Sequence, residues 1–274
     1  MSNNVNTVNQ KVVVTVAIVG LLTAIFLVYN ASWLPTIDPT ELSGENYYYH
    51  PNVPQEDQRV VCIVFDDGWL TQYTNARPVL DKYGFKATFA IVTSYPNRLL
   101  GYMDWNKIVA LHNQGHDIES HSVNHFPLRS NDMETVEYQL SQSKQDLLTH
   151  GIIASLFVYP HGEGAGDIAI EKVVQQYYYA ACGINQSNFD MSQPFNQYAL
   201  PSYAIGNSTT MEMFKNYVNQ ANSSTIVIIH YYQISDGAVS TSVTSEDFAA
   251  QMQYLYDNNF SVQTLKQLLI STTP

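Results

Sequence analysis

From Arg59 onward, short apolar runs alternate with stretches in which apolar residues recur at helical spacing. The first run, VVCIVF at residues 60–65, is continuous and rich in β-branched residues, which is typical of a strand buried on both faces of a parallel sheet. The later apolar runs predict strands at residues 86–92, 116–120, 155–159, 178–183, 225–230 and 260–265. The helical patterns between them predict helices at residues 71–83, 103–115, 131–151, 166–177, 209–221 and 245–259, followed by a short final helix.

This alternation indicates an α/β fold. Strands that alternate with helices at this spacing form a parallel sheet with right-handed crossovers. About seven such units would close into a TIM-like barrel. In a barrel and in an open α/β sheet alike, functional groups gather at the carboxyl ends of the strands. We therefore expect the chemistry of this chain in the residues that directly follow its strands.

Composition and charge narrow the classes of partner. With 274 residues, 45% of them hydrophobic, the chain is long enough for one large α/β domain with an ample core. Twelve basic and 24 acidic residues give a formal net charge of −12, which argues against a nucleic-acid binder because such proteins carry basic patches. Cys62 and Cys182 lie in predicted strands, and the sequence leaves open whether they form a disulfide or remain buried thiols.

The N-terminal residues have a different pattern. Residues 12–29 carry no charge and are preceded by Lys11 and by no acidic residue. A run of this length can just span a bilayer as a helix, and it exceeds the usual apolar core of a cleaved signal peptide. We predict cytoplasmic residues 1–11, a transmembrane signal anchor at 12–29, a linker at 30–58 and a folded domain at 59–274 outside the cytoplasm. The alternative is a cleaved signal, which would release the domain as a secreted protein.

Four of the predicted strands end in polar groups that are capable of chemistry. These groups are Asp66 and Asp67 after the first strand, His121 and His125 after the third, Pro160 and His161 after the fourth, and His230 at the end of the sixth. Each has an ordinary explanation when taken alone, since Asp-Gly is common turn chemistry and a histidine at the edge of a core is usually satisfied by hydrogen bonds. Taken together, a carboxylate and two imidazoles match the three protein ligands of a catalytic zinc site.

The adjacent carboxylates Asp66 and Asp67 are the clearest signal. Two like charges at the end of a buried strand repel each other, and desolvation adds to the cost. The spacing of His121 and His125 would place two imidazoles on one face of a helical turn, which suits a metal. A bound divalent cation would neutralise Asp67 and stabilise the ionised form of Asp66. The residues therefore predict a metal site.

In these motifs the chain resembles the polysaccharide deacetylases, the NodB-homology domain of carbohydrate esterase family 4. The segment VFDDGWLTQYTNARPVLDKYGFKATFAIVTS resembles the first motif of that family, and HSVNH, approached through GHDIES, resembles the second. FVYPHGEG resembles the third motif and IVIIHYY the fifth. The resemblance covers about residues 59–270 and implies that residues 59–274 form a catalytic domain, a distorted, seven-stranded (β/α) barrel. Its implied activity is the removal of N-acetyl groups from a polysaccharide.

The resemblance also implies roles for the residues around the metal. Asp67, His121 and His125 would bind a divalent cation, which is most often zinc in this family. Asp66 would be the general base that takes a proton from the attacking water. The metal would polarise the acetyl carbonyl and lower the pKa of that water.

Further roles follow from the third and fifth motifs. The backbone N–H of His161 would hold the oxyanion, although His161 stands where the family usually has Tyr or Phe. His230 would be the general acid that protonates the leaving amine. Candidate substrate contacts are Trp69, Tyr159 and Pro160.

Two departures from the family pattern affect the residues that assist catalysis. The third motif usually has an Arg, paired with the catalytic Asp, where this chain has Val158. The acid of the fourth motif, which orients the catalytic His, has no clear match, and Asp190 is a candidate only because it lies nearby in the sequence. Both departures leave the metal ligands intact and leave open what supports Asp66 and His230.

The preferred interpretation is a metal-dependent hydrolase that acts on N-acetyl groups of an extracellular or cell-surface polysaccharide. One alternative keeps the enzyme and changes the bond to an O-acetyl ester or a non-glycan amide. Another alternative is a glycan-binding domain that has kept its metal and lost its chemistry. The presence of both Asp66 and His230 argues against this last class, because binding alone needs neither.

Overall fold

A computed structural model describes residues 48–49, 51–237 and 239–271. They belong to one compact unit, Asn46–Pro274. The predicted membrane anchor at 12–29 lies outside the described residues, as does most of the predicted linker. Among the helices that the structure does describe, none is both long and apolar enough to cross a bilayer.

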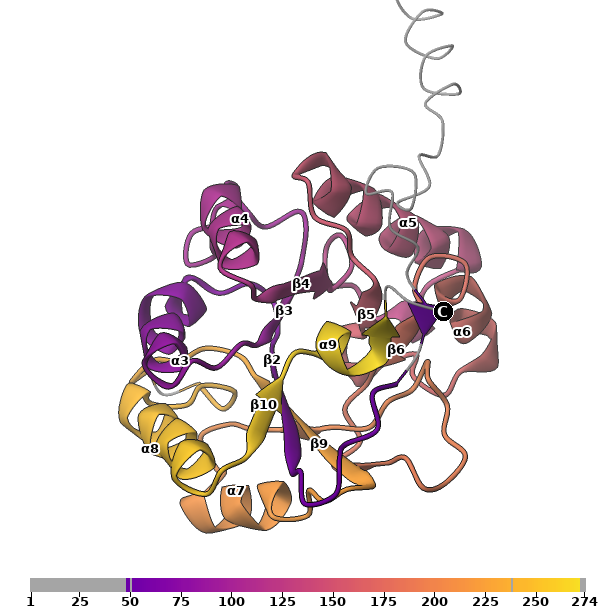
Figure 1. The fold of residues 1–274 in the computed structure, drawn as a ribbon. Helices are drawn as coiled ribbons and strands as arrows, with labels where there is room; N and C mark the ends of the chain where they lie inside the picture. Colours follow the sequence, from indigo (N-terminus) through magenta and orange to yellow (C-terminus); the bar gives the residue numbers. More distant parts are fainter. Residues whose placement is uncertain (1–47, 50, 238, 272–274) are drawn as a thin grey trace, which may run out of the picture. The chain divides into compact units, whose positions relative to one another are not determined.

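Strands alternate with helices along the described chain, and every predicted element has its counterpart (Figure 1). The strands are β1 (Tyr48–Tyr49), β2 (Val60–Phe65), β3 (Thr88–Ile91), β4 (Asp117–Ser120), β5 (Leu156–Val158), β6 (Ala180–Cys182), β7 (Phe189–Asp190), β8 (Tyr203–Ala204), β9 (Thr225–Tyr231), β10 (Ser261–Gln263) and β11 (Ile270–Ser271). The helices are α3 (Arg77–Tyr83), α4 (Trp105–Asn113), α5 (Met133–Thr149), α6 (Ile168–Val174), α7 (Met211–Val218), α8 (Ser245–Asp257) and α9 (Leu265–Leu269). Shorter helical turns are η1 (Gln72–Ala76), which is π-helical, and the 3₁₀ turns η2 (Leu128–Ser130) and η3 (Pro160–Gly162).

The main sheet is mostly parallel, as the alternation predicted. Its strands follow the order β6-β5-β4-β3-β2-β9-β7, with β10 paired to β2 and β8 paired to β9. Two pairings are antiparallel, β7 with β9 and the separate pair β1 with β11. The sequence did not predict β7 and β8, because strands of two residues are too short to show a periodic pattern.

The sheet curls, so that one segment contacts strands on both of its sides. Tyr203 and Ala204 of β8 pair with β9, while Leu200, just before them, forms a parallel bridge with Cys182 of β6. Leu200 N donates to Ala181 O at 2.9 Å. The predicted α/β fold with a curled sheet is thus confirmed. The predicted closed barrel of seven strands is not, because the contact between β6 and the segment before β8 is a single bridge instead of a ladder.

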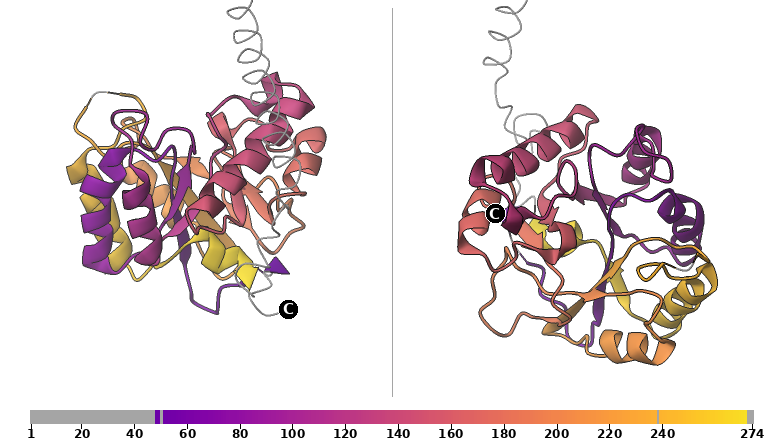
Figure 2. Two further views of the ribbon diagram at one scale, coloured as in Figure 1. Left: turned by 90° about the horizontal axis from the view of Figure 1, so that it is seen from above. Right: turned by 180° about the vertical axis from the view of Figure 1, so that it is seen from behind.

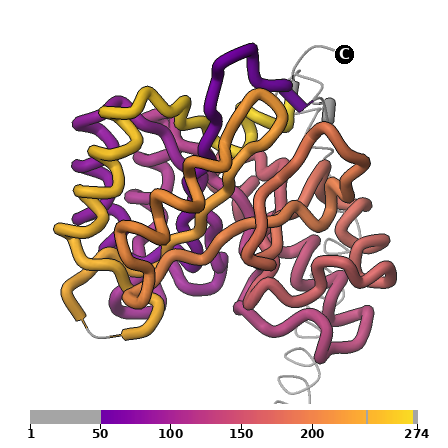
Figure 3. Tube along the Cα trace, turned by 90° about the horizontal axis from the view of Figure 1, so that it is seen from below, coloured from indigo at the N-terminus to yellow at the C-terminus, as the bar shows by residue number. Residues whose placement is uncertain are grey.

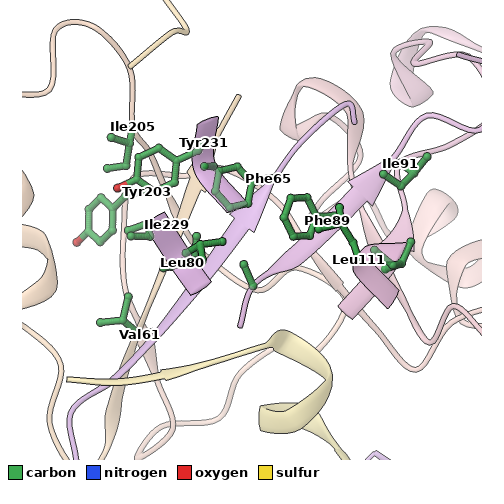
Figure 4. Close-up of a cluster of buried hydrophobic side chains, with 14 of the residues drawn as sticks. Val61, Phe65, Leu80, Phe89, Ile91, Leu111, Tyr203, Ile205, Ile229 and Tyr231 are labelled. Atoms are coloured by element: carbon green, nitrogen blue, oxygen red, sulfur yellow. The ribbon is translucent and has the colours of Figure 1, made fainter. Parts of the chain in front are cut away.

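Alternate residues of β2 divide between two apolar clusters. Val61, Ile63 and Phe65 belong to a cluster shared with the helices that lie outside the sheet (Figure 2). Figure 4 shows part of this cluster, where the Phe65 ring stacks on Phe89 with centroids 4.9 Å apart. The intervening residues of β2 face a second cluster inside the curl, together with β5 and β6. Because every residue of β2 is fully buried, the prediction of a strand covered on both faces is confirmed.

Strands β2 and β9, far apart in the sequence, run side by side in the sheet (Figure 3). Their register pairs Val64 with His230 and Phe65 with Tyr231. Asp66 N continues this pairing by donating to Tyr231 O at 2.9 Å. The register therefore places Asp66, the first residue beyond β2, beside the end of β9.

Candidate active site

Asp67, His121 and His125 meet beyond the carboxyl ends of β2 and β4, and their candidate ligand atoms all lie within 4.8 Å of one another. Asp67 Oδ1 is 3.5 Å from His121 Nε2 and 3.2 Å from His125 Nε2. The two Nε2 atoms are 3.1 Å apart. The structure therefore brings together the three side chains that the sequence predicted as metal ligands.

Left-handed backbone turns place these ligands. Asp67 has φ 74°, and in the loop after β4 Ser122 and His125 have φ 66° and 62°. Non-glycine residues adopt such angles rarely, and residues held in them are enriched at functional sites. The prediction that both histidines lie on one helical turn is wrong. The Ser122 hydroxyl instead accepts from His125 N at 3.0 Å and holds a non-helical loop.

A second layer of contacts orients the ligands. His121 Nδ1 lies 2.8 Å from Val158 O, which can only accept, so Nδ1 carries a proton. When the ring binds a cation in its neutral form, Nε2 is therefore the atom with a free lone pair. Trp69 Nε1 donates to Asp67 Oδ2 at 2.9 Å. Each contact leaves the atom that faces the cluster centre, His121 Nε2 or Asp67 Oδ1, available for a cation.

A divalent metal fits this arrangement. Asp67 Oδ1 is buried and has no hydrogen-bond partner within the described part of the chain. Burial lowers the pKa of His125 to about 4, with the charge of His121 acting in the same direction, so this ring is neutral and can be a ligand at neutral pH. One carboxylate oxygen and two imidazole nitrogens are a typical protein contribution to a catalytic zinc site.

Asp66 and His230 form a buried pair next to the cluster. His230 Nδ1 lies 3.0 Å from both carboxylate oxygens of Asp66, and the two residues are 1% and 0% exposed. Burial lowers the pKa of His230, but the charge of Asp66 and the hydrogen bonds to Asp66 and Cys182 outweigh this effect and raise it to about 10. The structure thus joins the predicted base and the predicted acid directly to each other.

The other ring nitrogen of His230 faces a cysteine. Cys182 Sγ lies 3.4 Å from His230 Nε2, and both Cys182 and Cys62 are free thiols. Asp190, the candidate for the orienting acid of the fourth motif, lies elsewhere. Its Oδ1 accepts from Ser192 N at 2.9 Å and from Ser192 Oγ at 2.6 Å. Residue order alone suggested Asp190, because it follows β6 in the chain, but β7 carries it to an exposed turn.

His161 lies on the solvent side of the cluster. Its backbone has φ 59°, and its exposed ring packs against the His125 ring with centroids 4.3 Å apart. His161 Nε2 lies 3.3 Å from His125 O, to which it donates. The side chain that replaces the aromatic residue of the third motif therefore supports a metal ligand.

Residues 54–181 match the family model described as polysaccharide deacetylase. These residues belong to the polysaccharide deacetylase family. The matched range contains Asp66, all three metal ligands and His161, whereas Cys182 and His230 lie beyond it.

Individual relatives agree with this family. Over 89 residues the chain is 36% identical to the Bacillus subtilis protein YxkH, whose name places it among polysaccharide deacetylases; the match covers 32% of this chain and 31% of YxkH. Over 126 residues it is 32% identical to a gellan lyase from a Bacillus species, covering 44% of this chain and 4% of the lyase. The chain thus spans less than a third of the length of the curated relatives it matches.

A solved structure shares the fold. The Streptococcus pyogenes deacetylase PplD, determined in complex with acetate, superposes with a TM-score of 0.52 at 19% identity, covering 57% of this chain and 68% of PplD. The curled α/β sheet is therefore the fold of the polysaccharide deacetylases.

The three candidate substrate contacts differ in exposure. Trp69 is half-buried and stacks on Tyr102 with ring centroids 4.1 Å apart. Pro160 is buried, and Tyr159 is 1% exposed with its hydroxyl donating to Tyr198 O at 3.0 Å. The side chains of Tyr159 and Pro160 are therefore buried, and Trp69 contacts the ligand cluster through its bond to Asp67.

Sequence reasoning missed two residues that contact the Asp66–His230 pair. Gln72, fully buried on η1, donates through Nε2 to Asp66 O at 2.6 Å and to Tyr232 O at 2.9 Å. The sequence feature that could have identified Gln72 is a polar residue at a helical position that the apolar spacing predicts to be buried. Cys182 carried no signal, because a cysteine inside an apolar strand reads as an ordinary core residue.

Proposed function

We propose that this chain is a metal-dependent hydrolase that removes N-acetyl groups from a polysaccharide. The observation that carries the proposal is the Asp67–His121–His125 cluster with the buried Asp66–His230 pair beside it. The family match of residues 54–181 supports the reaction class, and the acetate found with PplD is what such a reaction releases.

Asp67, His121 and His125 would hold the metal, for which we propose zinc. When bound, the metal would polarise the acetyl carbonyl and make the attacking water more acidic. The other tasks fall to residues of this chain. Asp66 takes the proton of the attacking water on its carboxylate, while His230 Nδ1–H holds that carboxylate in place.

The same pair returns a proton to the leaving group. The amide C–N bond breaks, acetate leaves, and the nitrogen of the sugar takes up one proton to become an amine. The predicted donor is His230, which is fully buried with Nδ1 directed at Asp66. We therefore propose that the proton reaches the amine through Asp66, the member of the pair that directly precedes the ligand Asp67.

The remaining predicted roles are part of the same proposal. The backbone N–H of His161 would stabilise the oxyanion, and the Trp69–Tyr102 stack would contact a sugar ring. The location is also a proposal. If residues 12–29 anchor the chain in a membrane, the hydrolase would act on a polysaccharide outside the cytoplasm.

Acetate release tests this function. Zinc-loaded protein would be incubated with N-acetylglucosamine polymers, peptidoglycan and acetylated xylan, each with and without a chelator. We expect release from an N-acetylated polymer that stops on chelation and is lost in Asp66→Asn. Release from acetylated xylan alone would instead support an O-acetyl esterase, and no release from any substrate would support a glycan-binding domain.

A further inference from the structure

Three side chains from three strands form a continuous buried row inside the curled sheet. They are Asp66 beyond β2, His230 on β9 and Cys182 on β6, and their exposed fractions are 1%, 0% and 1%. His230 lies in the middle, with Nδ1 3.0 Å from Asp66 and Nε2 3.4 Å from Cys182 Sγ. Both ring nitrogens of His230 are therefore satisfied without solvent.

Geometry gives the direction of the first of these hydrogen bonds. His230 Nδ1 lies 3.0 Å from both oxygens of the Asp66 carboxylate, an acceptor, so Nδ1–H is the donor. Cys182 Sγ lies 3.6 Å from Gly183 O and 3.5 Å from Leu200 O, and a carbonyl also can only accept. The thiol can donate to one of these carbonyls and accept from His230 Nε2–H, or it can donate to Nε2 itself. In either direction the contact joins Cys182 to the His230 ring.

We propose that Cys182 is a positioning residue of this hydrolase. Its sulfur contacts His230 Nε2, on the side of the ring opposite Asp66, and so keeps His230 Nδ1–H directed at Asp66. This inference rests on the proposed deacetylase function for its catalytic consequence, though not for the contact itself. It also accounts for both departures from the family pattern. His230 gives Asp66 the donor that an Arg at position 158 would supply, and Cys182 gives His230 the partner that Asp190 does not supply.

The register explains why a cysteine can reach this place. Val158 of β5 pairs with Cys182 of β6, and Leu200 bridges Cys182 on its other side. Cys182 thus lies where the curl closes, at the end of its strand. The other cysteine, Cys62, lies on β2 in the same inner cluster and is likewise fully buried, but no hydrogen bond joins it to His230 among the described residues. Cys62 is therefore a matched control for loss of a buried thiol.

The contact is tested first without activity. Nitrogen-15 NMR of the histidine rings would be recorded on zinc-free protein near neutral pH for wild type, Cys182→Ala, Cys182→Ser and Cys62→Ala. We expect the His230 Nε2 resonance to keep its wild-type position in Cys182→Ser and in Cys62→Ala. In Cys182→Ala we expect this resonance to shift, because Nε2 loses its buried hydrogen-bond partner. An unchanged His230 ring in Cys182→Ala, or the same change in Cys62→Ala, would overturn the proposal.

The catalytic consequence is tested on the same four proteins, after their zinc content and thermal unfolding have been compared. Loss of a supporting residue in the layer behind an active site typically costs about 10-fold or more, so we expect kcat of Cys182→Ala to fall by about that factor with little change in KM. Cys182→Ser should keep kcat near the wild-type value, because a hydroxyl can also form a hydrogen bond with Nε2. An equal fall in Cys62→Ala, or none in Cys182→Ala, would refute the positioning role. If wild type hydrolyses no substrate, the proposed function fails, and the NMR result still decides the contact.

Discussion

Trp69 Nε1 donates to Oδ2 of Asp67 at 2.9 Å, while Oδ1 of the same carboxylate faces the imidazoles of His121 and His125. The hydrogen bond determines which oxygen remains for a cation. Since the Trp69 ring also stacks on Tyr102, the direction of the Asp67 carboxylate depends on a packed aromatic pair.

Replacing the indole therefore tests metal affinity separately from the ligands themselves. Trp69→Phe keeps an aromatic ring against Tyr102 and removes the donor to Asp67. Loss of such an outer contact typically weakens metal binding by about 10-fold or more, and we expect this change in zinc affinity by competition with a chelator. Trp105→Phe is the control, because Trp105 stacks on His150 and not on the cluster. Equal zinc affinity in both variants would contradict the prediction.

The ligand assignment predicts different effects of substituting the adjacent residues Asp66 and Asp67. Asp67→Ala and His121→Ala should lose both bound zinc and activity, because each removes one of the three protein ligands. Asp66→Asn should keep zinc at wild-type stoichiometry and lose turnover, because an amide does not accept the proton of water. Zinc content by mass spectrometry of the folded proteins checks both statements. Stoichiometric zinc in Asp67→Ala would show that the assignment is wrong.

An arginine at position 158 should not be tolerated in this chain. Val158 is 1% exposed inside the curl, and His230 already contacts Asp66. A buried charge without its own partner costs several kcal/mol, so we expect Val158→Arg to lower the free energy of unfolding by about 3 kcal/mol or more. Val158→Ala, which leaves only a small cavity, should cost less. Urea unfolding that shows Val158→Arg as stable as wild type would mean that the site accommodates a second cation.

Stability should depend on pH through His230 in a particular direction. Its folded pKa is raised to about 10 from an ordinary value of 6.5, so the protonated ring stabilises the fold fully below about 6.5 and this contribution is lost as pH rises through about 10. The cost of His230→Gln, measured by urea unfolding of zinc-free protein, should therefore decrease from about pH 6 to about pH 10. A cost that stays constant or grows over this range would contradict the ion pair.

His116 provides the opposite case as a control. Burial, together with the charge of Lys86, lowers the pKa of His116 to about 4, and its Nδ1 accepts from Ala87 N at 3.2 Å. The neutral ring therefore contributes its full stability above about 6.5, and this contribution is lost as pH falls toward about 4. The cost of His116→Gln should accordingly decrease toward acid, where that of His230→Gln is largest.

The predicted anchor at 12–29 calls for a fractionation experiment. Full-length protein expressed in a bacterial cell should remain in the membrane fraction after a salt wash, with the folded domain accessible to protease from outside. Deletion of residues 1–29 should move the protein to the soluble fraction. Soluble full-length protein whose N-terminus lies near residue 31 would show a cleaved signal instead.

The sequence predicted those features of the fold that depend on patterns many residues long. The continuous apolar run of β2 and the helical spacing of α5 are such patterns, and both elements were found where they were predicted. The π-helical turn η1 was not predicted, because its apolar spacing is indistinguishable from the start of an α-helix. Strands β7 and β8 were missed because two residues have no period.

The site residues that directly follow strands could be predicted from the sequence. The contacts that depend on tertiary packing could not. Asp67, His121 and His125 follow parallel strands whose carboxyl ends lie at one edge of the sheet, so their meeting follows from topology. The left-handed turn at Ser122 depends on a local hydroxyl contact that the spacing did not indicate. Cys182 meets His230 across 48 positions of sequence, and its residue type inside a strand says nothing about that neighbour.

The distance in sequence between Asp66 and His230, 164 positions, has a consequence for how the protein is made. The ligands Asp67, His121 and His125 all leave the ribosome long before β9 does. A nascent chain can therefore gather its ligand residues while Asp66 still lacks a partner. The pair of Asp66 and His230 forms only when β9 docks against β2 and the segment before β8 closes the curl, and contacts of such long range form slowly. The proposed base thus gains its partner only after all three ligand residues have been synthesised.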